Sequence, residues 1–192
     1  MKKELSIHEF PGVLERHKIN PAELGCVMLD VMQDKTFSAP DLDGEDYLYK
    51  SPDPKKFWID GWVMNKAHIT LLYGLLEPAQ KYAVSIEEVL GMWKIEHVEI
   101  EEIGFFESPY PEEPYYCIVA HIRKTLELQE GHDRLTFLPH VNTFPGYKPH
   151  MTIAYIKKDA GIRDRLIKIM DGHYKFYPKV LVESGLNLGG SK

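Results

Sequence analysis

Short apolar stretches recur along the chain and predict β-strands. Residues 25–31 read Gly-Cys-Val-Met-Leu-Asp-Val and are apolar at almost every position, which is typical of a strand buried on both faces. Apolar and polar residues alternate through residues 95–106, and residues 115–122 are suited to pair with them as a hairpin. The other stretches of this kind are residues 67–73, 150–155 and 174–188.

Three stretches between the strands are predicted to be helices, partly from apolar residues three and four positions apart. The first begins at Pro78 and is expected to end near Trp93, because proline is favoured in the first turn of a helix. The second is expected to end near Leu135, and the third covers residues 159–170, with Gly172 closing it. This order of elements predicts an α+β fold, with residues 25–192 as a single domain behind an N-terminal arm of residues 1–24.

One predicted strand occurs twice with nearly the same sequence. Residues 66–73 read Lys-Ala-His-Ile-Thr-Leu-Leu-Tyr, and residues 148–155 read Lys-Pro-His-Met-Thr-Ile-Ala-Tyr. In a chain with 9 histidines and six threonines, chance places a threonine two positions after a histidine about 0.3 times. Two occurrences in matching apolar surroundings therefore indicate a functional repeat.

Alternation along a strand places the histidine and the threonine of each copy on one face. His68 and Thr70 share such a face, as do His150 and Thr152. Two strands of this kind, side by side, bring two imidazoles and two hydroxyls around one point. That arrangement suits a phosphate, because hydroxyls donate to its oxygens while one histidine accepts a proton and the other donates one. By the same alternation the remaining residues face the core, among them Tyr73 and Tyr155.

The paired motifs, their spacing and the order of elements over about residues 25–190 resemble the 2H phosphoesterase superfamily, which includes 2′-5′ RNA ligases and cyclic phosphodiesterases. The resemblance implies a two-lobed fold of antiparallel sheets, with helices on the outside and both motifs lining a central groove. It also implies that His68, Thr70, His150 and Thr152 form the catalytic set. The first copy departs from the usual pattern at Ala67, where many members carry proline, and this affects how the strand begins rather than the chemistry.

The chemistry expected of this set is that of a metal-independent phosphodiesterase. Its substrate would be a cyclic phosphate, or a 2′-5′ or 3′-5′ phosphodiester, of a nucleotide or an RNA end. One histidine accepts a proton from water or a 2′-hydroxyl, the other donates to the leaving oxygen, and the threonines stabilise the charge on the non-bridging oxygens. The sequence leaves open which histidine is the acid, and no cofactor is expected.

Other functions remain open beside this one. Residues 71–74 and 145–150 look like phage-type members of the superfamily, some of which hydrolyse cyclic di- or oligonucleotide signals of host immunity. A non-catalytic nucleotide- or RNA-binding module is an alternative of another class, although a binder has no need to keep two titratable groups. A metal centre is disfavoured, because the spacing of the histidines matches no zinc pattern: His121, His132, His140 and His150.

Several residues near the motifs are secondary candidates for binding substrate. Lys66 and Lys148 precede the two histidines by two positions and would attract an anion. Aromatic side chains would stack on a base, and a carboxylate in the last strand would orient a ligand or a histidine. These candidates are Tyr147, Trp62, Phe105 together with its neighbour Phe106, and Glu183.

Charge, apolar content and cysteine content limit which partners and which cellular location are expected for the protein. A net charge of −6 argues against binding to long double-stranded nucleic acid, which needs a basic surface, and favours a small nucleotide or an RNA end. No apolar run approaches the length of a membrane span or a signal sequence, so a cytoplasmic protein is expected, in the host cytoplasm if it is phage-encoded. Cys26 and Cys117 are expected to be buried, reduced thiols rather than a disulfide.

Overall fold

The computed structural model describes residues 24–32, 40, 42, 44, 46–107, 113–142, 146–176, 178–183 and 185–189. The predicted N-terminal arm therefore lies outside the described residues, except for Leu24.

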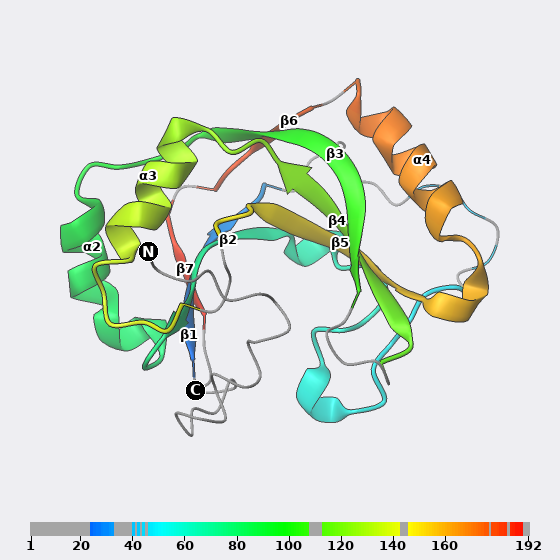
Figure 1. Ribbon diagram of the computed structural model, residues 1–192, viewed down its shortest axis with the longest axis horizontal. Coiled ribbons are helices and arrows are strands. Elements are labelled where there is room, and N and C mark those ends of the chain that lie inside the picture. The colour runs from blue at the N-terminus through cyan, green and yellow to red at the C-terminus, as the bar shows by residue number, and fades with distance from the viewer. Residues whose placement is uncertain are drawn as a thin grey trace, which may run out of the picture.

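Two antiparallel sheets form the framework of the protein (Figure 1). The smaller sheet has the order β2-β1-β7, and the larger has the order β5-β4-β3-β6. The sheets and their helices confirm the predicted α+β class. The strands are β1 (Gly25–Asp30), β2 (His68–Leu75), β3 (His97–Glu107), β4 (Tyr115–Ile122), β5 (His150–Lys157), β6 (Lys179–Leu181) and β7 (Asn187–Gly189).

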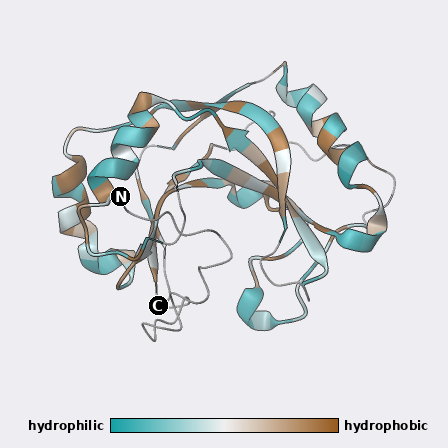
Figure 2. Ribbon diagram, in the orientation of Figure 1, coloured by the Kyte–Doolittle hydropathy of each residue, from teal (hydrophilic) through white to brown (hydrophobic). Residues whose placement is uncertain are grey.

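Helices lie on the outer side of each sheet (Figure 1). Helices α2 (Ala83–Leu90) and α3 (Leu126–Leu135) pack together, with α3 against β2, and α4 (Arg163–Tyr174) packs against β3. Figure 2 shows apolar positions among hydrophilic ones along α3 and α4, as expected for helices buried on one side. In the described part of the chain, no helix is long and apolar enough to cross a membrane.

Three predicted boundaries were wrong. The first helix begins with a 3₁₀ turn and its α-helical part ends at Leu90, because Gly91 adopts a φ of 57° that reverses the chain. Gly172 does not close α4, which continues to Tyr174. The single last strand predicted over residues 174–188 is two short strands that belong to different sheets.

The segment between β6 and β7 joins the two sheets. β6 pairs with β3, and the chain then passes beside β1 before β7 pairs with it. The Met32 N–H donates to the Leu181 carbonyl at 2.9 Å, and the Glu183 N–H donates to the Asp30 carbonyl at 2.9 Å. The C-terminal segment therefore fixes one sheet relative to the other.

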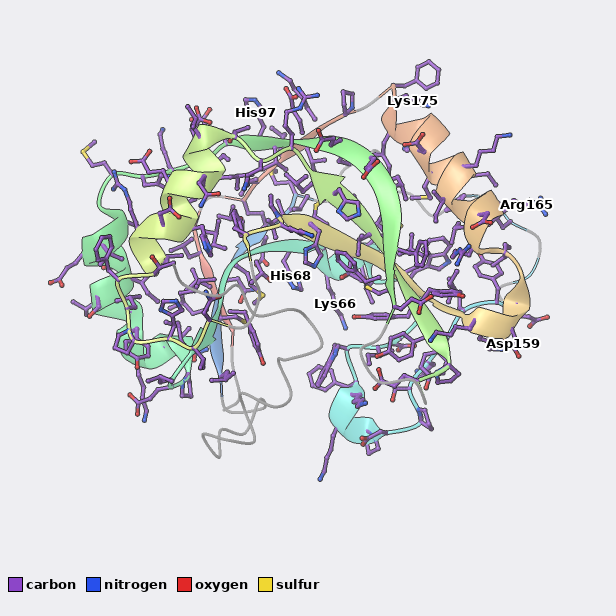
Figure 3. All side chains as sticks on the ribbon, in the orientation of Figure 1. Lys66, His68, His97, Asp159, Arg165 and Lys175 are labelled. Atoms are coloured by element: carbon purple, nitrogen blue, oxygen red, sulfur yellow. The ribbon has the colours of Figure 1, made fainter. Side chains whose placement is uncertain are left out.

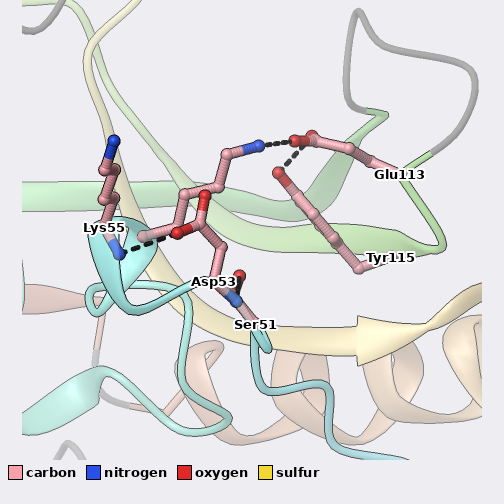
Figure 4. Close-up of polar contacts among 6 residues, drawn as sticks. Ser51, Asp53, Lys55, Glu113 and Tyr115 are labelled. Carbon is pink, nitrogen blue, oxygen red and sulfur yellow. Dashed lines mark hydrogen bonds and ion pairs between the residues drawn. The ribbon is translucent and has the colours of Figure 1, made fainter.

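A projecting loop covers the free edge of β5. The Tyr49 N–H donates to the Tyr155 carbonyl, and the Tyr155 N–H donates to the Gly61 carbonyl, both at 2.9 Å. Between these points the loop is held by polar contacts, including a Lys56–Glu113 ion pair and a 2.5 Å hydrogen bond from the hydroxyl of Tyr115 to Glu113 (Figure 4). β5 is thus supported along both edges.

Gly131 of α3 is expected to resist substitution, although alanine is normally the better helix former. A Cβ atom at this position would lie 2.4 Å from the ring of Trp93. Overpacking costs about 1–3 kcal/mol, which exceeds the gain of about 1 kcal/mol in helix propensity. We expect Gly131→Ala to lower the free energy of unfolding by up to about 2 kcal/mol in urea denaturation. Gly172→Ala in α4 is the control, because open space surrounds that position, and it should not destabilise the protein.

Candidate active site

The two repeated motifs begin strands that lie next to each other. β2 and β5 are each the outermost strand of their sheet, and they neighbour one another where the sheets meet (Figure 1). Figure 3 shows His68 and Lys66 near the centre of the molecule. His68 is close enough for its charge to influence His150. The structure therefore brings the two halves of the sequence-predicted set together.

Both imidazoles are held in the same way. The Nδ1 atom of His68 lies 3.0 Å from the Lys66 carbonyl oxygen, and the Nδ1 atom of His150 lies 2.9 Å from the Lys148 carbonyl oxygen. A carbonyl only accepts hydrogen bonds, so Nδ1 carries the proton in each neutral ring. Nε2 is then the atom of each ring that accepts or donates a proton in a reaction.

A β-bulge occurs at the same place in both motif strands. Consecutive residues Val27 and Met28 of β1 pair with Leu72 and Thr70, so Leu71 is the additional residue. On β4, Ile118 and Val119 pair with Ala154 and Thr152, so Ile153 is additional. The side-chain alternation is interrupted at these points, as seen from two consecutive buried residues in each strand: Leu71 and Leu72 in β2, and Ile153 and Ala154 in β5.

The bulges bring the repeated tyrosines to the same face as the histidines and threonines. The prediction that Tyr73 and Tyr155 face the core was wrong, because strict alternation does not hold across a bulge. Tyr73 lies opposite Cys26, and Tyr155 lies opposite Cys117. Each motif therefore presents His, Thr and Tyr on one half-buried face, which we call the motif face: His68, Thr70 and Tyr73 on β2, and His150, Thr152 and Tyr155 on β5.

Thr152 has polar neighbours on this face. The Sγ atom of Cys117 lies 3.6 Å from the Thr152 hydroxyl, and Tyr155 interacts with both. Burial raises the pKa of Cys117 to about 11, and the pKa of Cys26 likewise to about 11. Both are free thiols, as predicted, and at neutral pH they are protonated. The Cys117 thiol can therefore donate to Thr152, which leaves the hydroxyl hydrogen of Thr152 available to a ligand.

His150 lies in an aromatic environment. The ring of Phe106 meets the His150 ring edge-on at 4.9 Å between centroids, and it meets His121 at 5.5 Å. Burial lowers the pKa of His150, and the nearby positive charges of His121 and His68 lower it further. The hydrogen bond to Lys148 opposes this shift without cancelling it. His150 is therefore biased toward the neutral imidazole.

Residues 63–183, which contain both motifs and the strands that carry them, match the family model described as the 2′-5′ RNA ligase superfamily. The chain belongs to the 2′-5′ RNA ligase superfamily. This confirms the predicted membership among the 2H phosphoesterases.

Comparison with other proteins adds little to the superfamily match. Among solved structures, the protein is similar to Usb1 of Kluyveromyces marxianus, with 6% sequence identity and a TM-score of 0.43. That similarity covers 87% of this chain and 97% of the Usb1 chain. A comparison with curated proteins finds no match.

Three of the secondary candidates for binding substrate lie close to the motifs: Lys66, Lys148 and Trp62. Lys66 and Lys148 are exposed, and their carbonyl groups hold His68 and His150 in place. Trp62 forms a bridge with Ala154 and meets Tyr47 edge-on at 6.3 Å. The loop that contains Trp62 thus lies against β5, the strand of the second motif.

Three other candidates are directed away from the motif face. Tyr147 stacks on His132 of α3 at 4.3 Å, and burial raises the pKa of its hydroxyl. Phe105 lies on the side of β3 that α4 covers, where the Arg163 guanidinium is 4.3 Å from its ring. Glu183 borders a hollow on the helix side of the smaller sheet, together with Leu90 and Trp93.

Two residues beside the motif face were not among the sequence-predicted residues of the phosphodiesterase site: His121, which was considered only as a metal ligand, and Asp30. His121 lies opposite His150, and Asp30 lies opposite His68. Of the two neighbouring phenylalanines suggested for stacking on a base, Phe106 is the one whose ring contacts His150. Within the described residues, no three histidine, cysteine or acidic side chains are arranged to hold a metal ion.

Proposed function

We propose that the protein is a phosphodiesterase that acts on a cyclic phosphate, or on a 2′-5′ or 3′-5′ phosphodiester, of a nucleotide or an RNA end. The observation that carries this proposal is the pair of His-x-Thr units with equivalent Nδ1–carbonyl bonds on adjacent strands. Two imidazoles with available Nε2 atoms supply an acid and a base to one phosphate. A central groove between two lobes, lined by both motifs, is part of the same proposal.

His150 is the base in this mechanism. Its lowered pKa favours the neutral imidazole, which accepts a proton at Nε2 from water or from a 2′-hydroxyl. His68 donates a proton from Nε2 to the leaving oxygen. Thr70 and Thr152 donate hydrogen bonds to the non-bridging oxygens, where negative charge increases in the transition state. In the reverse direction the two histidines exchange roles.

A panel of substrates tests the proposal. Purified protein is incubated with 2′,3′-cyclic mononucleotides, 2′-5′ and 3′-5′ dinucleotides, and cyclic dinucleotides, and the products are separated by chromatography. We expect hydrolysis of at least one of the first three classes. Turnover of cyclic dinucleotides alone would instead support the phage-type hydrolase of immune signals. Binding without turnover of any compound would identify a nucleotide-binding module and contradict the proposal.

Activity is expected to survive removal of divalent metal ions. The proton transfers and the charge stabilisation are assigned to His68, His150, Thr70 and Thr152. Turnover measured after dialysis against EDTA should therefore stay within about twofold of the untreated rate. Complete loss, reversed by adding one divalent ion, would show that a metal takes part.

A further inference from the structure

The two motif strands have equivalent neighbours in their sheets. β1 lies beside β2 as β4 lies beside β5, and the two pairs share the same bulge. The threonines face Met28 and Val119, and the repeated tyrosines face two cysteines. The surroundings of the two motifs are therefore closely alike in register and partly alike in residue type.

The similarity is broken opposite the histidines. His68 faces Asp30 of β1, whereas His150 faces His121 of β4. Directly opposite residues in an antiparallel pair have their Cβ atoms about 4.5–5.5 Å apart. The register thus places an acidic residue opposite one histidine and a third histidine opposite the other.

Other residues hold both of these neighbours in position. The amide nitrogen of Asn187 on β7 lies 2.8 and 3.0 Å from the two carboxylate oxygens of Asp30. The contact with both oxygens fixes the orientation of the Asp30 carboxylate. The ring of His121 lies over Gly104, where an added Cβ atom would be 2.6 Å from Nε2. Gly104 therefore provides the space that His121 occupies.

We propose that Asp30 and His121 are positioning residues that assign the roles of the two catalytic histidines. Asp30 favours the charged imidazole at His68, which acts as the acid, and His121 disfavours a second charge at His150, which acts as the base. An opposite charge within about 4–6 Å stabilises an ionised group, and a like charge destabilises it. The inference rests on the proposed function for its kinetic consequences, but not for the titration of the imidazoles.

Among the described residues, the other charged groups that sequence or register places near the pair are exposed. Lys66 and Lys148 precede the two histidines, and both side chains are exposed. Glu102 of β3 lies opposite His121 and is also exposed. These groups are more strongly screened by water than Asp30 and His121, which are half-buried. The two half-buried neighbours are therefore the ones expected to distinguish His68 from His150.

The test measures both titration and catalysis in Asp30→Asn and His121→Gln. In NMR titrations of the imidazole Cε1–H signals, we expect the midpoint of His150 to rise by about 0.3–1 pH unit in His121→Gln. We expect the midpoint of His68 to fall by a similar amount in Asp30→Asn. In the pH–rate profile, His121→Gln should move the acidic limb to higher pH. Asp30→Asn should move the basic limb to lower pH.

Two control variants each remove a group of the same kind, a carboxylate or an imidazole, far from the motif face. Glu87→Gln on α2 and His97→Gln at the exposed start of β3 should leave both midpoints unchanged. Unchanged midpoints in Asp30→Asn and His121→Gln, or shifts equal to those of the controls, would overturn the inference. Shifted midpoints in a protein that hydrolyses none of the panel would support the inference while contradicting the proposed function. A variant that fails to fold is replaced by Asp30→Ser or His121→Ser, which remove the same ionisable groups, with the same expected shifts.

Discussion

Replacing either histidine of the pair with alanine is expected to lower turnover by about 10² to 10⁴, the usual contribution of a general acid or base. His68→Ala removes the proposed proton donor, and His150→Ala removes the proposed acceptor. The fold should persist, because both side chains are only half-buried and both motif strands keep their pairing. Steady-state kinetics on the substrate identified by the panel, with a thermal melt of each variant, measures the effect.

His140→Ala is the matched control for these variants. His140 makes the same kind of contact, with Nδ1 2.8 Å from the Leu138 carbonyl, but it pairs with Leu75 at the far end of β2. At about 3.3 Å per residue, that end lies roughly 23 Å from His68. Activity within a few-fold of the parent in His68→Ala or His150→Ala, or an equal loss in His140→Ala, would refute the assignment.

Thr70→Val and Thr152→Val are expected to reduce kcat by about 10² to 10³, which corresponds to about 2.7–4 kcal/mol of transition-state stabilisation. Valine keeps the branched shape and the strand preference of threonine but removes the hydroxyl. The loss should therefore appear in the chemical step, with little change in melting temperature. Single-turnover measurements at saturating substrate separate this effect from weaker binding.

Thr70→Ser and Thr152→Ser provide the rescue, because serine retains the hydroxyl and loses only a methyl group. Each serine variant should recover most of the rate lost in the corresponding valine variant. Normal turnover in the valine variants, with only a lower melting temperature, would show that these threonines serve the strands and not the phosphate.

The sequence was sufficient to predict the strands that carry the motifs. Duplication of His-x-Thr in matching apolar contexts is a local signal, and alternation correctly placed each histidine with its threonine. The tyrosines were misplaced because a bulge depends on how two strands pair, and Leu71 and Ile153 resemble ordinary strand residues in the sequence.

Sequence periodicity could not identify the residues of neighbouring strands that lie opposite the two histidines. Asp30 lies in a strand that is apolar enough to suggest burial on both faces, and its position opposite His68 depends on the register of β1 against β2. The same holds for His121, which faces His150 across β4 and β5. Phe105 and Phe106 were not distinguished by the sequence, because a change of one residue reverses the face of a strand and the face of β3 was unknown.

The pairing of β1 with β7 has a consequence for biosynthesis. The hydrogen bonds between Asp30 and Asn187 join residues 157 positions apart, so β1 is made long before its partner. Until residues 187–189 leave the ribosome, one edge of β1 stays open and the Asp30 carboxylate lacks its amide partner. The larger sheet has its three long strands within residues 97–157 and can assemble earlier. During translation, the strand β1 that supports the His68 half of the motif face is therefore the last to gain its full set of partners.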